Sequence, residues 1–213
     1  MTTTRARNGT LGPTLRSLRA QTLQPDAVRV YAADDAGEWD AHTYGFERIV
    51  AVDRGPVTKL SAIQDLDLEA EDLVITIDDD IVYEPTWLET LLAAAAKHPA
   101  DAVGMSGWNA GRFLHRTHGS FEFVRPPATC DVLEGWSGAV YRRGWFELDV
   151  LEPPDEFRFV DDVWISSYLH RRGIARRVVS RPLAAEAFVG RPGLHTRPDF
   201  KALNQRAARL GFL

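Results

Sequence analysis

The chain has 213 residues, of which 45% are hydrophobic, and a formal net charge of −5. This length supports one sizeable core, and we predict a single domain over residues 1–213. Nucleic acids and anionic membranes both attract basic surfaces, so the acidic composition argues against either as the main partner. The single cysteine, Cys130, excludes an intramolecular disulfide and a cysteine zinc cluster. The sequence has no apolar leader stretch and no run of about 18 apolar residues, so we expect a cytoplasmic protein without a membrane span.

Helices and strands alternate through the first half of the chain. Segment 84–99 carries apolar residues on one helical stripe and a proline near each end, which is typical of a helix. Segment 73–77 is a continuous apolar run, as in a parallel strand that is covered on both faces. The other elements predicted here are helices over 12–25, with Pro13 in the first turn, and 58–66, and strands over 28–35, 48–53 and 101–108. This order predicts an α/β fold, a three-layer α/β/α sandwich with a mainly parallel sheet.

The second half of the chain is less regular. Glycine, proline and aromatic residues crowd segment 104–127, where we expect loops and a hairpin. The elements predicted beyond it are a strand over 133–143 entered through a glycine-rich turn, a helix over 161–173 that ends at a glycine, a strand over 175–180 and a helix over 197–210.

Three consecutive acids, Asp78, Asp79 and Asp80, follow the apolar strand 73–77. Like charges this close repel, by about 4 kcal/mol for a pair at an effective dielectric near 20. Ligands of open α/β sheets bind at the carboxyl ends of strands, where these acids fall. On an extended backbone Asp78 and Asp80 share one face and Asp79 points the other way. We interpret the pair as ligands of Mg²⁺ or Mn²⁺, which relieves the repulsion, and the alternative is that the acids solvate a loop or cap the next helix.

A second acidic pair, Asp161 and Asp162, begins the helix over 161–173. Acids at a helix start accept the unpaired backbone N–H groups and favour the helix dipole, which is sufficient reason for their presence. The functional alternative is that one of them is a general base, which must be ionised and must reach the proton of an attacking hydroxyl.

Taken together, the motifs resemble those of the inverting glycosyltransferases of family 2, which have the GT-A fold. The matching segments are "SLRAQTLQP", the strand ending in "DDD", "EGWSGAVYRR" and "DDVWISSYLHRRG", in that order. The resemblance implies that the chain is a hexosyltransferase-like enzyme that uses Mn²⁺ or Mg²⁺, a nucleoside-diphosphate-sugar donor, with a UDP-sugar favoured, and a hydroxyl acceptor such as a carbohydrate. It further implies that residues 1–108 form the nucleotide-sugar half and residues 109–213 the acceptor half.

The resemblance also assigns roles to the two acidic groups. It implies that Asp78 contacts the nucleotide, that Asp80 binds the metal bridging the diphosphate, and that Asp79 supports one or both. It implies that Asp162 deprotonates the acceptor hydroxyl and that Asp161 orients the acceptor. Such a base, placed opposite the leaving diphosphate, gives inversion in one displacement.

Further positions follow from the order of the motifs. Those implied as contacts of the nucleotide or the donor sugar are Thr3, Thr4, Arg5, Asp34, Lys59, Trp136 and Gly138. For Lys59 the alternative is a solvated lysine at a helix start, and for Trp136 it is a place in the core. His195 is the leading candidate for a third metal ligand, although lone histidines are often structural, and His115 and His118 compete for that role or for contact with the acceptor.

Two other classes of protein stay open on sequence grounds. A sugar nucleotidyltransferase also uses acids on an α/β sheet, but it should carry a glycine-rich phosphate loop, which "RARNGTLGP" matches only in part. A non-catalytic carbohydrate- or nucleotide-binding module is the other alternative, and the presence of Asp162 argues against it.

Overall fold

The computed structural model of the protein describes residues 1–3, 8–32, 45–111, 121–186 and 194–212. Its α-helices are α1 (Asn8–Arg19), α2 (Trp87–Lys97), α4 (Asp161–Arg171) and α5 (Phe200–Phe212). Short 3₁₀ helices, labelled η, are η3 (Pro56–Gln64), η4 (Gly135–Ser137), η5 (Arg143–Trp145), η6 (Leu148–Leu151), η7 (Asp155–Phe157) and η8 (Leu194–Thr196). None of the helices in these ranges is long and apolar enough to cross a bilayer.

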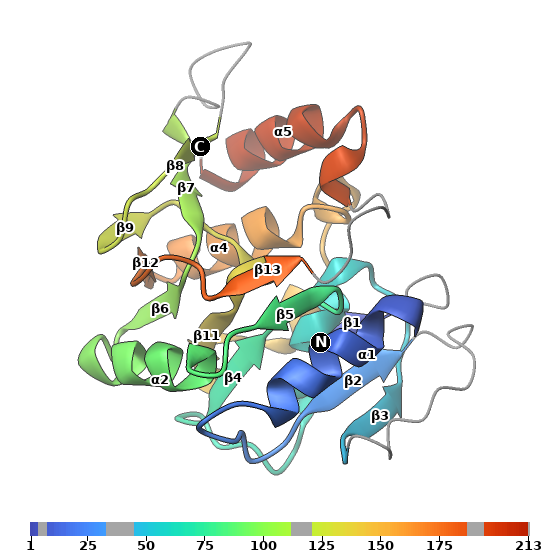
Figure 1. The fold of residues 1–213 in the computed structure, drawn as a ribbon. Coiled ribbons are helices and arrows are strands. Elements are labelled where there is room, and N and C mark those ends of the chain that lie inside the picture. Colours follow the sequence, from blue (N-terminus) through green and yellow to red (C-terminus); the bar gives the residue numbers. More distant parts are fainter. Residues whose placement is uncertain (4–7, 33–44, 112–120, 187–193, 213) are drawn as a thin grey trace.

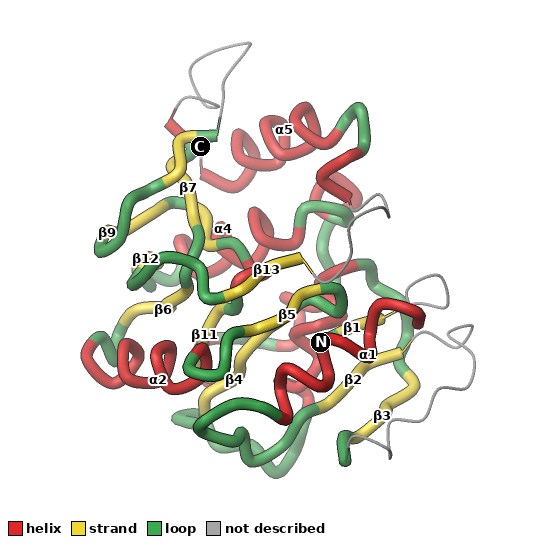
Figure 2. The backbone as a smooth tube through the Cα atoms, viewed as in Figure 1, coloured by secondary structure: helices red, strands yellow, loops and turns green. Residues whose placement is uncertain are grey.

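The strands form one larger and three smaller sheets. Strands β4 (Leu73–Thr76), β11 (Ala139–Arg142), β6 (Asp101–Gly104), β12 (Ala175–Val178) and β9 (Ala128–Cys130) form the larger sheet, in that order. Strands β1 (Thr2–Thr3), β2 (Arg29–Ala32) and β3 (Glu47–Val50) form an all-parallel sheet beside α1 (Figure 2). The small sheets are β10 (Val132–Leu133), β7 (Gly107–Asn109) and β8 (Glu122–Phe123), and β13 (Ala184–Glu186) with β5 (Ile81–Tyr83).

Strand direction in the larger sheet is mixed. Strands β6 and β12 pair in parallel, and β4 runs in the same direction, but β11 lies antiparallel between β4 and β6. Strand β9 also pairs antiparallel, with β12. The predicted α/β fold is confirmed, and its parallel pairings are those of β1, β2 and β3 and that of β6 with β12. The expected hairpin in 104–127 corresponds to the antiparallel pairing of β7 with β8.

Helices cover both faces of the larger sheet, with α2 on one side and α4 on the other (Figure 1). Neighbouring residues of a strand point to opposite faces, so a doubly covered strand contributes to two cores. In β11, Val140 packs in a cluster with residues of α1 and α2, whereas Ala139 and Tyr141 pack with residues of η3, α4 and α5. This is the predicted three-layer arrangement.

Two element predictions need correction. Helix α1 begins at Asn8, so Pro13 lies inside the helix and not in a first turn at residue 12. The helix predicted over 58–66 is the 3₁₀ helix η3, in which Val57, Leu60 and Ile63 are buried at intervals of three residues. A 3₁₀ helix has three residues per turn, so this spacing places all three on one face.

Candidate active site

The three acids after β4 alternate in burial, although Asp79 and Asp80 lie in a turn and not on the extended backbone that was predicted. Asp79 is buried, at 1% exposure, whereas Asp78 and Asp80 are half-buried. Asp78 is held in place by the hydroxyl of Tyr83, which accepts a hydrogen bond from the Asp78 backbone N–H at 3.2 Å and donates to the carbonyl of Trp136 at 3.1 Å. Strand β5 thus ties the end of β4 to η4.

The positive charge at this strand end is Lys59, on η3. Its side chain is 4% exposed, and Nζ lies 2.9 Å from Asp78 Oδ1, 2.9 Å from Asp161 Oδ2 and 3.7 Å from Asp162 Oδ1. Burial lowers the pKa of the Lys59 ammonium, but the carboxylates of Asp161, Asp78 and Asp162 outweigh burial and raise it well above its ordinary value. Lys59 is therefore charged, and the alternative of a solvated lysine is wrong.

The second acidic pair lies at the start of α4, as predicted, and it meets the first acidic group through Lys59. Asp162 Oδ1 also accepts a hydrogen bond from the backbone N–H of Gly135 at 3.0 Å. A Cβ at position 135 would lie 2.6 Å from Lys59 Nζ and 3.0 Å from Asp162 Oδ1, so a larger residue there would displace the Lys59 ammonium from this position. Two groups that are far apart in the sequence thus share one small volume.

The environment of Asp162 suits a base. Burial, with the neighbouring Asp161 carboxylate next, raises the pKa of Asp162 well above its usual value, and Lys59 opposes that rise. A carboxylate with a raised pKa accepts a proton more readily, while 31% of the side-chain surface of Asp162 still reaches solvent.

Glu134 is a further acid at the site that the sequence did not single out. One of its oxygens, Oε2, accepts hydrogen bonds from the hydroxyl of Ser106 and from the indole N–H of Trp136, the latter at 3.1 Å. Burial raises the pKa of Glu134. Glu134 therefore fixes the indole of Trp136, which is half-buried and packs against the α1–α2 core. Its place directly before the predicted glycine-rich turn was the available signal.

Gly138, predicted to contact the donor, has a clear packing role. Its φ is +91°, and a Cβ there would lie 2.3 Å from a ring carbon of Trp87. Trp87 on α2 also donates its indole N–H to the carbonyl of Ser137 at 2.8 Å. Gly138 thus lets α2 pack closely on η4.

The remaining predicted residues fall outside this cluster or outside the described structure. Thr3 is buried at the end of β1, at the carboxyl edge of the parallel sheet. His195 lies in η8, but its side chain is not described. The positions outside the described residues are Thr4, Arg5, Asp34, His115 and His118.

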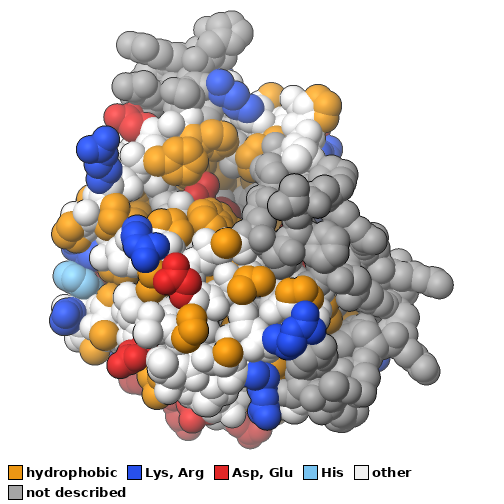
Figure 3. All heavy atoms as spheres, in the orientation of Figure 1, with side chains coloured by type: hydrophobic (Ala, Val, Ile, Leu, Met, Phe, Trp, Pro, Cys, Tyr) orange, Lys and Arg blue, Asp and Glu red, His pale blue; other side chains and the backbone are white. Residues whose placement is uncertain are grey.

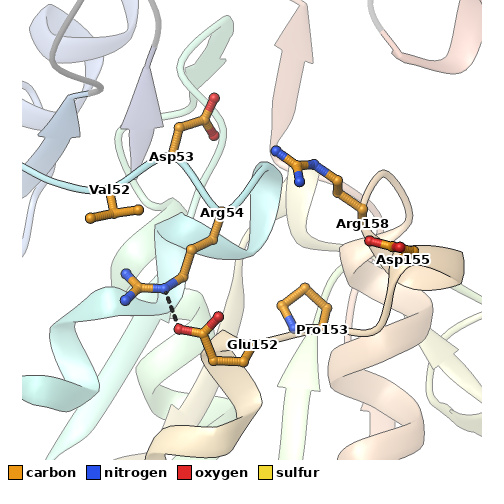
Figure 4. Close-up of a pocket in the computed structure, with 7 residues that line it drawn as sticks. All are labelled: Val52, Asp53, Arg54, Glu152, Pro153, Asp155 and Arg158. Carbon is orange, nitrogen blue, oxygen red and sulfur yellow. Dashed lines mark hydrogen bonds and ion pairs between the residues drawn. The ribbon is translucent and has the colours of Figure 1, made fainter.

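A separate pocket of about 200 Å³ lies between the loop after β3 and the segment from η6 to η7 (Figure 4). Arg54 donates to Glu152 across it at 2.8 Å. The full lining is Val52, Asp53, Arg54, Glu152, Pro153, Asp155 and Arg158, and it contains none of the predicted site residues.

On the face drawn in Figure 3, the described basic side chains are scattered among acidic and hydrophobic ones.

The comparisons with known proteins bear on the fold. No protein-family model and no curated protein matches the sequence. Among solved structures, S. aureus TarS superposes with a TM-score of 0.53 at 16% identity, over 88% of this chain and 36% of the other. S. aureus TarS 1–349, solved in complex with UDP, superposes with a TM-score of 0.57 at 15% identity, over 99% of this chain and 64% of the other. The chain thus shares the fold of these TarS structures. This chain spans less than two thirds of either TarS chain.

No three His, Cys, Asp or Glu side chains within the described ranges are grouped so that they could hold a metal ion together. A divalent ion of the Mg²⁺ type needs only one or two carboxylates when water and phosphate oxygens complete its shell. Asp78 and Asp80, both half-buried at the strand end, fit that smaller requirement, and the bond from Lys59 occupies only Oδ1 of Asp78.

Proposed function

We propose that this protein transfers a glycosyl group, of the hexosyl type, from a UDP-sugar to an acceptor hydroxyl, with inversion at the anomeric carbon. The observation that carries the proposal is the meeting of Asp162 with Asp78 through Lys59, in a fold similar to one solved with UDP bound. Stabilisation of the helix start would be reason enough for Asp161 and Asp162 alone. It does not explain why the ammonium that contacts them also contacts Asp78, at the end of another element.

Asp162 acts as the base in this proposal. Its oxygen Oδ1 is occupied by the Gly135 N–H and faces the Lys59 ammonium, which leaves Oδ2 for the acceptor. The acceptor hydroxyl oxygen attacks the anomeric carbon, the bond from that carbon to the diphosphate oxygen breaks, and the hydroxyl proton passes to Oδ2. The products are the glycosylated acceptor and UDP, which carries the electron pair of the broken bond.

Asp78 and Asp80 are the residues that would hold Mg²⁺ or Mn²⁺ on the donor side. When bound there, such an ion would neutralise charge that develops on the leaving diphosphate. Trp136, fixed by Glu134, would offer its ring to the apolar face of a sugar. We assign donor binding to residues 1–108 and acceptor binding to residues 109–213.

The test is a screen of UDP-sugars with Mn²⁺ or Mg²⁺, in which release of UDP by hydrolysis or transfer is measured for the wild type and for Asp162→Asn. The proposal predicts release by the wild type and a loss of roughly 10²-fold to 10⁴-fold in the variant, the range typical of a general base. Release of pyrophosphate in place of UDP would indicate a nucleotidyltransferase. If neither UDP nor pyrophosphate is released from any donor in the screen, the glycosyltransferase and the nucleotidyltransferase proposals are both contradicted.

A further inference from the structure

The ammonium of Lys59 lies where the donor side and the acceptor side of the proposed site meet. It contacts Asp78 at the end of β4 and Asp161 at the start of α4, both at 2.9 Å. Element β4 belongs to the larger sheet, whereas α4 covers one of its faces. Lys59 is thus a bridge between two structural elements.

The contacts of Lys59 are with the protein's own carboxylates. Of the three donors of the ammonium, two face Asp78 Oδ1 and Asp161 Oδ2 at 2.9 Å, and Asp162 Oδ1 lies 3.7 Å from Nζ. The backbone of Gly135 closes the remaining side, since a Cβ at that position would lie 2.6 Å from Nζ. With 4% of its side chain exposed, Lys59 does not present its charge to a bound diphosphate.

We propose that Lys59 is a positioning residue that holds the Asp161–Asp162 pair at a fixed position relative to Asp78. One buried ammonium then orients both the proposed base, Asp162, and the carboxylate on the donor side, Asp78. This inference rests on the proposed function. It assigns Lys59 a role other than nucleotide binding, and it predicts that losing the ammonium affects the chemical step more than donor affinity.

The variants that test this role are chosen by the net charge that they leave around position 59. Lys59→Met leaves three carboxylates close together without their cation, and breaking a buried ion pair from one side is strongly destabilising. Adding Asp161→Asn removes one of those charges and keeps the shape of the side chain. Lys97→Met is the matched control, because Lys97 is an exposed lysine in the last turn of α2.

The first experiment measures melting temperature and needs no substrate. We expect Lys59→Met to lower the melting temperature strongly, Lys97→Met to leave it unchanged, and the double variant Lys59→Met/Asp161→Asn to regain most of the loss. An unchanged melting temperature in Lys59→Met, or no recovery in the double variant, would overturn the inference.

The second experiment separates positioning from donor binding. Lys59→Met is compared with the wild type at a temperature where the variant is folded, and the double variant is compared with Asp161→Asn. In each comparison we expect kcat for UDP release to fall at least tenfold, while the Kd for UDP measured by calorimetry with Mn²⁺ changes less than threefold.

Three results are distinguishable. If the wild type releases UDP from no donor, the proposed function fails and this inference fails with it. If the wild type is active and folded Lys59 variants keep kcat, only the inference fails. If the variants lose UDP affinity in place of kcat, Lys59 is a diphosphate ligand and the inference is again wrong.

Discussion

At the scale of single residues, the site is defined by a deficit of positive charge. Asp78, Asp161 and Asp162 share one ammonium, so the group carries a formal excess of negative charge. A buried site with such an excess favours a bound proton or cation. Burial is the main cause of the raised pKa of Asp162, and the Asp161 carboxylate adds to it, although the Lys59 ammonium lies 3.7 Å away.

The raised pKa of Asp162 predicts the pH dependence of turnover. A base must be ionised, so kcat/KM should fall as the pH drops through the pKa of Asp162, and that pKa lies above the ordinary carboxyl value of about 4. Asp161→Asn removes a negative neighbour, so the acidic limb should move to lower pH in a pH–rate profile of UDP release. A limb that stays in place or moves to higher pH would show that another group titrates.

The same environment predicts that the charge of Asp162 costs stability. The folded state holds the proton of Asp162 more tightly than the unfolded state, so stability falls as the pH rises from the unfolded pKa through the folded one. At pH 7, Asp162→Asn should therefore match or exceed the wild type in the free energy of unfolding. Denaturant titration measures this, with Asp155→Asn on an exposed acid as control. A large loss of stability in Asp162→Asn alone would contradict this view of the site.

At the scale of elements, the site depends on close packing between η4 and its neighbours. Gly135, the first residue of η4, leaves room for Lys59 and Asp162, and Gly138, directly after η4, leaves room for Trp87 of α2. Helix α2 therefore supports the turn that closes over the Lys59 ammonium.

Alanine substitutions at two glycines with positive φ distinguish the cost of backbone strain from the cost of a steric clash. Gly138→Ala adds a Cβ 2.3 Å from Trp87 at a φ of +91°, whereas Gly173→Ala adds one to open space at a φ of +71°. Both should lose roughly 1 kcal/mol or more through strain, and Gly138→Ala should lose a further 1–3 kcal/mol or so through the clash. The free energy of unfolding of both variants is measured by denaturant titration. Equal losses in Gly138→Ala and Gly173→Ala would mean that α2 can shift away from η4 at little cost.

At the scale of the whole molecule, local patterns predicted the long regular elements and missed the contacts between distant ones. The apolar stripe of α2 and the apolar run of β4 were sufficient to predict both. The sheet of β5 with β13 was not predicted, because each strand has three residues and their pairing joins positions far apart in the chain. For η3, the three-residue spacing of Val57, Leu60 and Ile63 was a usable signal for a 3₁₀ helix.

In the candidate site, too, the sequence predicted local features and missed the contacts between distant residues. The sequence marked both acidic groups, because each follows or begins a recognisable element. It did not predict that Lys59 joins them, since the contacts run from η3 to the end of β4 and to the start of α4, and only the packing of η3 against both brings them together. The third metal ligand stays a prediction.

The proposed binding of UDP leads to a prediction for the stability of the whole molecule. UDP with Mn²⁺ should raise the melting temperature, by an amount that corresponds to about 2.7 kcal/mol when UDP is present at 100 times its Kd. Asp80→Asn should reduce the metal-dependent part of this shift. A shift that is the same with and without the metal would contradict the assignment of Asp80.

Release of UDP from a UDP-sugar is the measurement that tests glycosyl transfer with Asp162 as the base. With each donor of the panel and Mn²⁺, the wild type and Asp162→Asn are compared at equal concentrations after circular dichroism has established that both are folded. We predict that the wild type releases UDP from at least one donor and that the variant loses at least roughly 10²-fold of that activity. Near wild-type release of UDP by folded Asp162→Asn would contradict the role of Asp162 as the base.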